Sequence, residues 1–381
     1  MIKKEKIFNG LDTLRALAIT LVLLFHYRFF QHPVWMDSIF QFGWIGVDLF
    51  FVLSGFLISN QLFEEMQLRN KINLSVFFIK RSFRILPPYL FILGLYIFVP
   101  AFHERETLPP LWKMFTFTQN FNQNIDIYGT FSHSWSLCVE EQFYLLLPVI
   151  LIFLFSFGIK NKYGWLLPAV FLLTLLLRAV TWEFYLKPIE QSDNFGMEWY
   201  KNIYYPTYTR LDGLITGVAI ASLYRFKEKL FFQLKHFGNW FLLAGFIVFG
   251  CCYFVAGDQH SGKATIFSFS LIAIAFGFFV LSAISPGSFL YRFKSAVTRN
   301  LATLSYSLYL SHKGLIHITQ GIFGKIFDAS SNWMLIVCLL ICILGALVMR
   351  FLIEKPALKM RNKILSRLKP STIIHPNVTI V

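Results

Sequence analysis

Arg15 and His26 lie eleven residues apart in the first apolar segment of the chain. Because an α-helix turns about 100° per residue, both side chains point to one face, about 16 Å apart along the axis. A guanidinium and an imidazole on one face of a membrane helix are costly to leave in lipid. We therefore predict that they line a water-accessible cavity in a helix bundle, with His26 near its outer end as a general base on a hydroxyl group.

A second polar group opens the fourth apolar segment. Ser136, Glu140 and Tyr144 are spaced by four residues and so share one helix face. We expect Glu140 in the outer part of its segment, at the same depth as His26. Its carboxylate is therefore predicted to orient His26 and to stabilise the protonated ring. The alternative is that Glu140 and Glu141 neutralise a buried arginine.

Arg81 and Arg84 are three residues apart and share a helical face at the predicted cytoplasmic boundary. Two adjacent guanidinium groups can grip a pyrophosphate bidentately, which indicates a phosphate-bearing ligand. The alternative is a basic anchor at the membrane surface, which is common at cytoplasmic helix ends.

Three further positions carry polar groups in apolar surroundings. Asp212 either pairs with Arg210 or another membrane charge, or contacts the substrate. Gly213 and Gly217, four residues apart, favour close packing of two helices. His312 lies in the outer half of its segment, where it either faces the cavity or is a packed polar residue.

The composition indicates a membrane protein made of α-helices. Of the 381 residues 56% are hydrophobic and only 14% are charged, well below the charge of a soluble domain. The apolar residues form blocks of about bilayer length. We predict an all-α polytopic protein with about ten transmembrane helices, near residues 11–30, 41–60, 85–103, 134–158, 164–184, 206–224, 239–256, 264–284, 300–322 and 333–353.

The net charge of +15 follows from topology. With the N-terminus inside and the spans alternating, most of the 35 lysine and arginine residues fall in inner segments, and half of the acidic residues fall in outer loops. This positive-inside pattern predicts that both termini are cytoplasmic and that the basic excess meets membrane lipids. No basic patch interleaved with aromatic residues indicates a nucleic-acid partner.

The five cysteines do not indicate a metal site. They lie within or beside apolar segments, and their spacing matches neither a zinc site nor a disulfide framework. We predict that they are small apolar packing residues and that the protein holds no metal.

At these residues the chain resembles the acyltransferase 3 type of integral-membrane acyltransferases, which includes bacterial O-antigen O-acetylases and nodulation-factor acetylases. Arg15 and His26 match the Arg-x10-His motif of the family, and Arg81 and Arg84 match its Arg-x-x-Arg pair. Further elements match in the same order: Phe50 to Phe56, the Ser-x-x-Trp-Ser-Leu-x-x-Glu-x-x-Phe-Tyr motif from Ser132 to Tyr144, Arg210 to Gly213, Ser305-Tyr306, and Glu354 to Pro356.

The resemblance implies transfer of an acyl group, usually acetyl, from cytoplasmic acyl-CoA to a sugar hydroxyl outside a bacterial inner membrane. It covers a domain at residues 7–356, followed by a basic cytoplasmic tail at 357–381, as in stand-alone members without an appended esterase domain. No cofactor is held permanently, and acetyl-CoA is a co-substrate. In this scheme His26 and Glu140 are catalytic, and the remaining site residues bind donor (Arg15, Arg81, Arg84) or substrate (Ser132, Trp135, Arg210, Asp212).

Two other classes of function stay open at this point. An exporter or flippase of a glycolipid or acylated metabolite would show paired broken helices, which the sequence does not indicate. A catalytically silent receptor or assembly subunit would use His26 and Glu140 only for folding or binding. The acceptor is also open, because lipopolysaccharide O-antigen, exopolysaccharide and a lipid-linked sugar all offer suitable hydroxyl groups.

Overall fold

A computed structural model describes residues 9–156, 165–255 and 257–368, and this part of the chain folds into helices without strands. The α-helices are α1 (Asn9–Tyr27), α2 (Trp35–Phe40), α3 (Ile45–Arg69), α4 (Leu74–Phe98), α5 (Leu111–Phe115), α6 (Trp135–Ser156), α7 (Leu166–Thr181), α8 (Phe195–Trp199), α9 (Asp212–Phe226), α10 (Glu228–Leu234), α11 (Gly238–Val255), α12 (Gly262–Ile284), α13 (Phe289–Arg292), α14 (Ala296–Phe323), α15 (Asn332–Met349) and α16 (Lys355–Arg367).

Short 3-10 and π-helical turns connect them. They are η1 (Pro100–Phe102), η2 (Ser132–Ser134), η4 (Trp182–Leu186), η5 (Lys187–Ile189), η6 (Tyr200–Tyr204), η7 (Thr207–Thr209), η8 (Lys235–Phe237) and η9 (Arg350–Glu354).

Seven stretches of the described chain are long and apolar enough to cross a membrane. They are Asn9–Tyr27, Trp35–Arg69, Ser132–Ser156, Leu166–Ile189, Glu228–Val255, Gly262–Ile284 and Asn332–Arg367. The all-α membrane fold is therefore confirmed. The three other predicted spans are also helices, α4, α9 and α14. α9 has 15 residues, and the other two carry basic side chains such as Arg81 and Lys313, so ten crossings remain a prediction.

Polar side chains begin several of these helices at the points where the apolar segments start. Asn73 accepts a hydrogen bond from the N–H of Val76 at the start of α4. Ser261, Ser295 and Ser331 do the same, each for the N–H three residues on, at the starts of α12, α14 and α15. Such caps satisfy N–H groups that have no partner within the helix.

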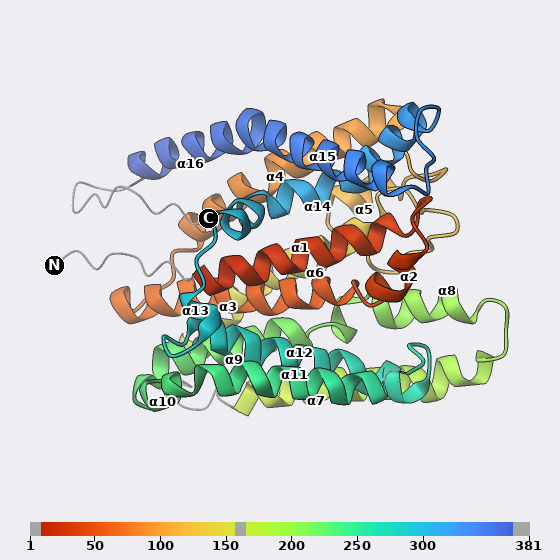
Figure 1. The fold of residues 1–381 in the computed structure, drawn as a ribbon. Coiled ribbons are helices and arrows are strands. Elements are labelled where there is room, and N and C mark those ends of the chain that lie inside the picture. Colours follow the sequence, from red (N-terminus) through yellow and green to blue (C-terminus); the bar gives the residue numbers. More distant parts are fainter. Residues whose placement is uncertain (1–8, 157–164, 256, 369–381) are drawn as a thin grey trace.

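The long helices run in roughly one direction across the bundle, which gives it two distinct ends (Figure 1). At one end lie the start of α1, the end of α3, α10, α13 and the end of α16, with basic residues such as Lys229, Lys235 and Arg292. At the other end lie α2, α5 and α8. We call these the basic end and the loop end. The positive-inside pattern predicts that the basic end faces the cytoplasm.

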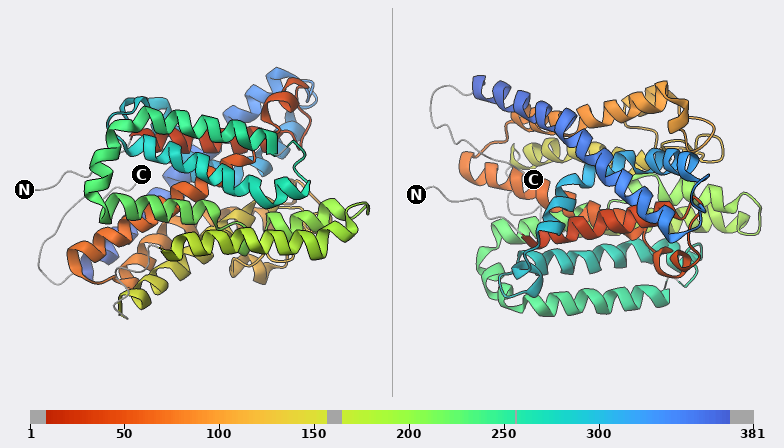
Figure 2. Two further views of the ribbon diagram at one scale, coloured as in Figure 1. Left: turned by 90° about the horizontal axis from the view of Figure 1, so that it is seen from below. Right: turned by 45° about the horizontal axis from the view of Figure 1, so that its top comes forward.

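Helix α1 lies in the middle of the bundle, between α14 with α15 and α11 with α12 (Figures 1 and 2). It contacts α14, α3 and α12. Its face at Ala18, Ile19 and Val22 is fully buried in these contacts. The helix that carries Arg15 and His26 is thus enclosed by protein on several sides. This is expected because exposing a guanidinium or an imidazole to lipid is energetically unfavourable.

Helices α3 and α9 approach each other closely because glycine stands at their crossing. A Cβ atom on Gly217 would overlap the carbonyl oxygen of Val52 and the nitrogen of Phe56. A Cβ on Gly55 would overlap the carbonyl of Leu214. The predicted close packing at Gly217 is confirmed, and Gly213 likewise sits against the side chain of Phe51.

The final described segment extends the bundle at the basic end. α15 passes through the π-helical turn η9 into α16, which packs against α4. Residues 357–367 of the predicted tail are thus helical, and 369–381 lie outside the described residues. The boundary at 356 falls within a continuous helical segment, and the division into domain and tail stays a prediction.

Candidate active site

His26 lies in the last turn of α1 and makes its one described side-chain hydrogen bond with another histidine. Its Nδ1 atom is 2.8 Å from Nε2 of His312 on α14. The two rings stack, with centroids 4.9 Å apart and planes inclined by 21°. His312 is fully buried, whereas His26 is half-buried. His26 is therefore held in one orientation by a buried neighbour.

The surroundings of His312 determine which nitrogen of His26 is basic. Nδ1 of His312 lies 2.8 Å from the carbonyl oxygen of Tyr309 and 3.1 Å from that of Leu308. A carbonyl only accepts, so Nδ1 of His312 carries a proton, and Nε2 of the neutral ring accepts. His26 then donates from Nδ1, which leaves a lone pair on its Nε2 atom. This tautomer is what a general base needs.

No described hydrogen bond joins Glu140 to His26, so the predicted orienting contact is not found, and a catalytic role of Glu140 stays a prediction. Its carboxylate accepts hydrogen bonds from Ser54 at 2.9 Å and from Tyr144 at 3.0 Å. It interacts electrostatically with Arg15 and Arg81. The helical spacing of Ser136, Glu140 and Tyr144 was sound, but Glu140 lies deeper in the bundle than the outer position that we expected. The alternative, a glutamate that neutralises buried arginines, describes the structure better.

Two of the three predicted donor-binding arginines, Arg15 and Arg81, lie near this carboxylate, and Arg84 lies near Arg15. Arg81 donates to Oε1 of Gln61 at 3.1 Å, and its guanidinium lies 5.6 Å from the centre of the Tyr144 ring. Arg15 and Arg84 interact electrostatically with each other, and Arg84 also with Glu354. All three arginines are half-buried among helices, so they keep accessible surface inside the fold. We call Arg15, Arg81 and Arg84 the arginine cluster.

Arg210 and Asp212 lie in the core, which favours a structural role over the predicted contact with substrate. Arg210 donates to Asp48 at 2.7 Å, and its guanidinium lies 4.0 Å from the centre of the Phe269 ring. Asp212 pairs with Arg178 and accepts a hydrogen bond from Ser270 at 2.7 Å. Each of these charges is at most 4% exposed. Because the charges are paired and enclosed, their contacts are structural.

Ser132 and Trp135 have different surroundings. Trp135 is buried against Phe51 and Tyr204 and lies under the Arg210 guanidinium, so it does not line an open mouth. Ser132 is half-buried in η2, and its carbonyl accepts from Gln123 at 3.2 Å. A contact of Ser132 with substrate stays a prediction.

Comparison with known proteins decides the family. A family model described as "Acyltransferase domain" matches residues 8–351, which is most of the chain. The chain belongs to this acyltransferase family. It is 28% identical over 332 residues to the O-acetyltransferase OatA of Staphylococcus aureus strain NCTC 8325, covering 81% of this chain and 50% of that protein. It is 27% identical over 341 residues to the putative O-acetyltransferase SACOL0978 of strain COL, covering 84% and 52%.

The chain thus spans about half the length of the curated relatives it matches. No solved structure matches it. The predicted family is confirmed, and the protein is a multi-pass membrane protein of that family.

Two further histidines lie beside His26. The sequence predicts that His312 either faces the cavity or is a packed polar residue, and the structure brings its ring against that of His26. The sequence does not identify His133. His133 lies in η2 and is 3% exposed. Its ring centroid is 4.9 Å from that of His312 and 5.8 Å from that of His26. We call His26, His133 and His312 the histidine cluster.

The described histidine, cysteine and carboxylate side chains form no group of three that could hold a metal ion. Within the histidine cluster, His26 and His312 are hydrogen-bonded directly to each other.

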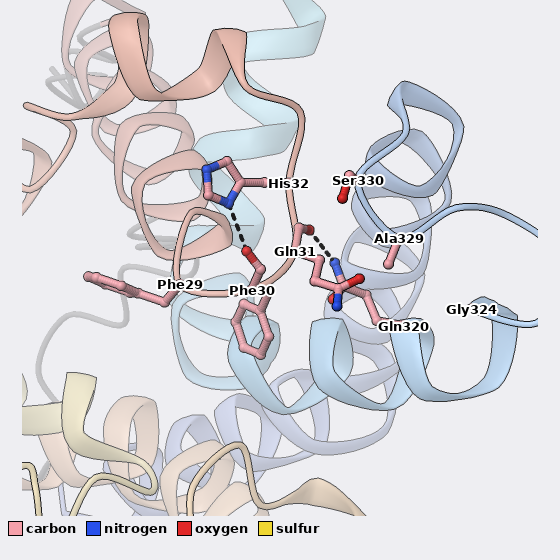
Figure 3. A pocket seen from close by; sticks show the side chains of 8 residues that line it. All are labelled: Phe29, Phe30, Gln31, His32, Gln320, Gly324, Ala329 and Ser330. Atoms are coloured by element: carbon pink, nitrogen blue, oxygen red, sulfur yellow. Dashed lines mark hydrogen bonds between the residues drawn. The ribbon is translucent and has the colours of Figure 1, made fainter.

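An open depression of about 740 Å³ lies at the loop end, beside the histidine cluster. Its lining joins the segment after α1 with the end of α14 and the loop that follows: Phe29, Phe30, Gln31, His32, Gln320, Gly324, Ala329 and Ser330. Gln320 donates to the carbonyl of Gln31 at 2.8 Å, and the Phe29 side chain points away from the other lining groups (Figure 3). The Phe29 ring lies 6.0 Å from the His26 ring, so one lining residue of the depression contacts the base, and His26 itself does not line it.

A second depression, of about 580 Å³, lies at the basic end and is lined by Asn9, Tyr291, Arg292 and Lys294. The arginine cluster and the histidine cluster lie at different depths along α1. A continuous cavity between them stays a prediction.

Proposed function

We propose that this protein is a membrane O-acyltransferase that moves an acetyl group from cytoplasmic acetyl-CoA to a hydroxyl group of an extracytoplasmic glycan. The family match and the names of the relatives support acyl transfer to oxygen. The acetyl-CoA donor and the glycan acceptor are our inference. The proposed location is a bacterial inner membrane, with the basic end in the cytoplasm.

One observation carries the proposal: α1 presents an arginine to a basic cluster near one end and a base with a free lone pair near the other. The eleven residues from Arg15 to His26 span about 16 Å. The phosphates of CoA are strongly charged and would stay at the basic end, where guanidinium groups suit them. The long pantetheine arm would then carry the thioester along α1 toward His26.

The chemistry at His26 is a direct transfer. Nε2 of His26 takes the proton of the acceptor hydroxyl as its oxygen bonds to the thioester carbonyl carbon. The C–S bond then breaks, and the CoA thiolate leaves with the proton that His26 returns. His312 keeps the ring in the required tautomer throughout. A covalent acyl-histidine intermediate is the alternative path.

The loop end supports a neutral polar acceptor. The depression at the loop end offers the amides of Gln31 and Gln320, the imidazole of His32 and the hydroxyl of Ser330, with the exposed ring of Phe29 at its edge. Hydroxyl-rich sugars bind through such hydrogen-bonding groups together with apolar ring faces. Lipopolysaccharide O-antigen, exopolysaccharide and a lipid-linked sugar all present that chemistry.

The test measures acetyl transfer by the purified protein in proteoliposomes. Radiolabelled acetyl-CoA is supplied on the side of the basic end, with glycan from the host envelope on the other. Wild-type protein is expected to label the glycan and release CoA, and His26→Ala to abolish both. His317→Ala, an exposed histidine on α14, is the matched control and should retain activity.

The outcomes separate the classes of function. An exporter or flippase would move glycolipid and leave no label on glycan. A catalytically silent subunit would give neither label nor transport. Full activity of His26→Ala would refute the assignment of the base while leaving acyl transfer intact. Mass spectrometry of surface glycans from cells with and without the gene then identifies the acceptor by its lost acetyl mass.

A further inference from the structure

His133 is a buried imidazole, and no described residue makes a hydrogen bond of ordinary geometry to either of its ring nitrogens. The backbone of Leu310 makes only a weak hydrogen-bonding contact with the ring, outside the ordinary hydrogen-bond geometry. Buried polar side chains almost always have a partner, because an unmade hydrogen bond is costly in a low-dielectric interior. A buried side chain that lacks one calls for an explanation, and a reacting group supplied by the substrate is one.

The main chain on either side of His133 is firmly held. Phe131 adopts a left-handed conformation with φ of 56°, which is rare for a bulky residue. Its N–H bonds to Glu104 at 3.1 Å. The hydroxyl of Ser134 donates to the carbonyl of Phe131 at 2.6 Å, and the carbonyl of His133 itself accepts from Tyr309. The fold therefore fixes the position of a ring whose nitrogen atoms it leaves unused.

The ring faces the reacting centre. It lies edge-on to His312 and to His26, at 69° and 61° between planes. Its centroid is 5.8 Å from that of His26, and no direct hydrogen bond joins the two rings. An oxygen atom to the side of the line between the two ring centres can lie about 2.8 Å from one nitrogen of each ring.

We propose that His133 is a catalytic residue of the acyl transfer, whose ring N–H donates a hydrogen bond to the carbonyl oxygen of the acyl group. The proposal rests on the proposed function. As the acceptor oxygen attacks the carbonyl carbon, the π electrons of the carbonyl group move onto the carbonyl oxygen, and the N–H of His133 stabilises the negative charge there. These electrons then re-form the C=O bond, and the C–S bond breaks. His26 handles the proton, and His133 handles the oxyanion.

This division of labour uses the features that distinguish the two rings. His26 is half-buried, hydrogen-bonded through Nδ1 and basic at Nε2, as proton transfer requires. His133 is fixed, buried and unpartnered, so it needs no reorganisation to meet a developing charge. Preorganised donors in a water-excluded site favour the transition state over the ground state.

The decisive variants remove the donor while keeping the volume or the polarity. His133→Phe is expected to lower kcat by about 10²- to 10³-fold, the usual effect of losing one oxyanion donor, with little change in the KM for acetyl-CoA. His133→Asn, whose amide also donates, is expected to recover part of kcat. His317→Phe on the exposed face of α14 is the matched control and should behave as wild type.

A second reaction distinguishes this role from binding of the acceptor. Slow hydrolysis of acetyl-CoA without glycan uses the same carbonyl, so His133→Phe should slow hydrolysis and transfer by similar factors. If hydrolysis is spared and only transfer falls, His133 acts on the acceptor and the proposal is wrong. Near-wild-type kcat in His133→Phe also overturns it.

Folding is controlled on the same samples. Size-exclusion profiles and thermal unfolding in detergent are measured for every variant. If His133→Phe does not fold, His133→Asn and His133→Leu carry the comparison, and equal kcat in the two overturns the proposal. Failure of the proposed function itself looks different, because wild-type protein would then neither transfer nor hydrolyse acetyl groups.

Discussion

The carboxylate of Glu104 lies 3.1 Å from the ammonium group of Lys313, and the two side chains are only 2% and 9% exposed. The same carboxylate oxygen accepts the backbone N–H of Phe131, two residues before His133. Lys313 directly follows His312 on α14. One buried ion pair therefore joins the segment that positions His133 to the helix that positions His312, and through His312 to His26.

Removing the charge of Glu104 should destabilise the protein and loosen this connection. Glu104→Gln keeps an oxygen for the Phe131 N–H but leaves Lys313 buried without a counter-charge, which typically costs about 3–5 kcal/mol. We expect the thermal unfolding midpoint in detergent to fall. Lys313→Met should be similarly harmful alone, and the double variant should recover part of the loss. Strictly additive effects of the two changes would contradict a direct pair.

His312 is expected to act through His26 as a positioning residue. His312→Phe removes the acceptor at Nδ1 of His26, so the basic tautomer is no longer fixed, and kcat should fall by about 10- to 100-fold. His312→Gln offers an oxygen near the position of Nε2 and should recover part of kcat. The KM for acetyl-CoA should change little, because the arginine cluster is untouched.

The pH profile gives a readout that a merely structural role of His312 would not move. A general base works only while it is unprotonated, so activity of the wild type should fall as pH decreases. In His312→Gln the acidic limb of that profile should shift, because the group bonded to His26 has changed. An unchanged limb together with an unchanged kcat would show that His312 does not govern His26.

The membrane fold was predictable from the sequence because lipid imposes a simple rule. Blocks of apolar residues about as long as the bilayer is thick must form helices, and the structure has helices at all ten predicted spans. The close approach at Gly217 was equally predictable, because two glycines four residues apart, here Gly213 and Gly217, indicate a close contact between helices. These features depend on local sequence alone.

Partners across the bundle were less predictable. The spacing of Arg15 and His26 along one helix could be calculated, but the depth of Glu140 relative to His26 depends on where α6 begins in the membrane. A charged partner was one of two interpretations of Asp212, and the structure shows that this partner is Arg178 on α7. His133 and His312 lie 179 positions apart, and no periodicity in one chain reveals that their rings meet.

Asp212 should prove structural when it is tested directly. Asp212→Asn leaves Arg178 buried with a weakened partner, and we expect about 3–5 kcal/mol of destabilisation, seen as a lower unfolding midpoint. The KM for the glycan should be unchanged in the protein that remains folded. Glu183→Gln, in an exposed pair with Lys187, is the control and should cost about 0–1 kcal/mol. A raised KM with an unchanged midpoint would restore the substrate role.

The arginine cluster should govern the donor and not the acceptor. Arg84→Gln removes one charge near the basic end, and we expect the KM for acetyl-CoA to rise by about tenfold, the effect of one charge-assisted hydrogen bond. The KM for the glycan should stay the same. Arg225→Gln, which removes a half-exposed charge paired with Glu64, is the matched control. Equal effects of the two changes would indicate general attraction of an anion to a basic surface.

The contact between α3 and α9 gives a test of the packing that holds the buried charges in place. Gly217→Ala would push a methyl group into the main chain of α3 at Val52 and Phe56. Main-chain atoms of a packed helix cannot move aside as the end of a flexible side chain can. Overpacking of this kind costs about 1–3 kcal/mol, so the unfolding midpoint should fall. Gly250→Ala on α11 meets nothing within 4 Å, and alanine is the better helix former there. The control should therefore be neutral or slightly stabilising, and equal losses in both variants would mean that α3 and α9 do not approach as closely as described.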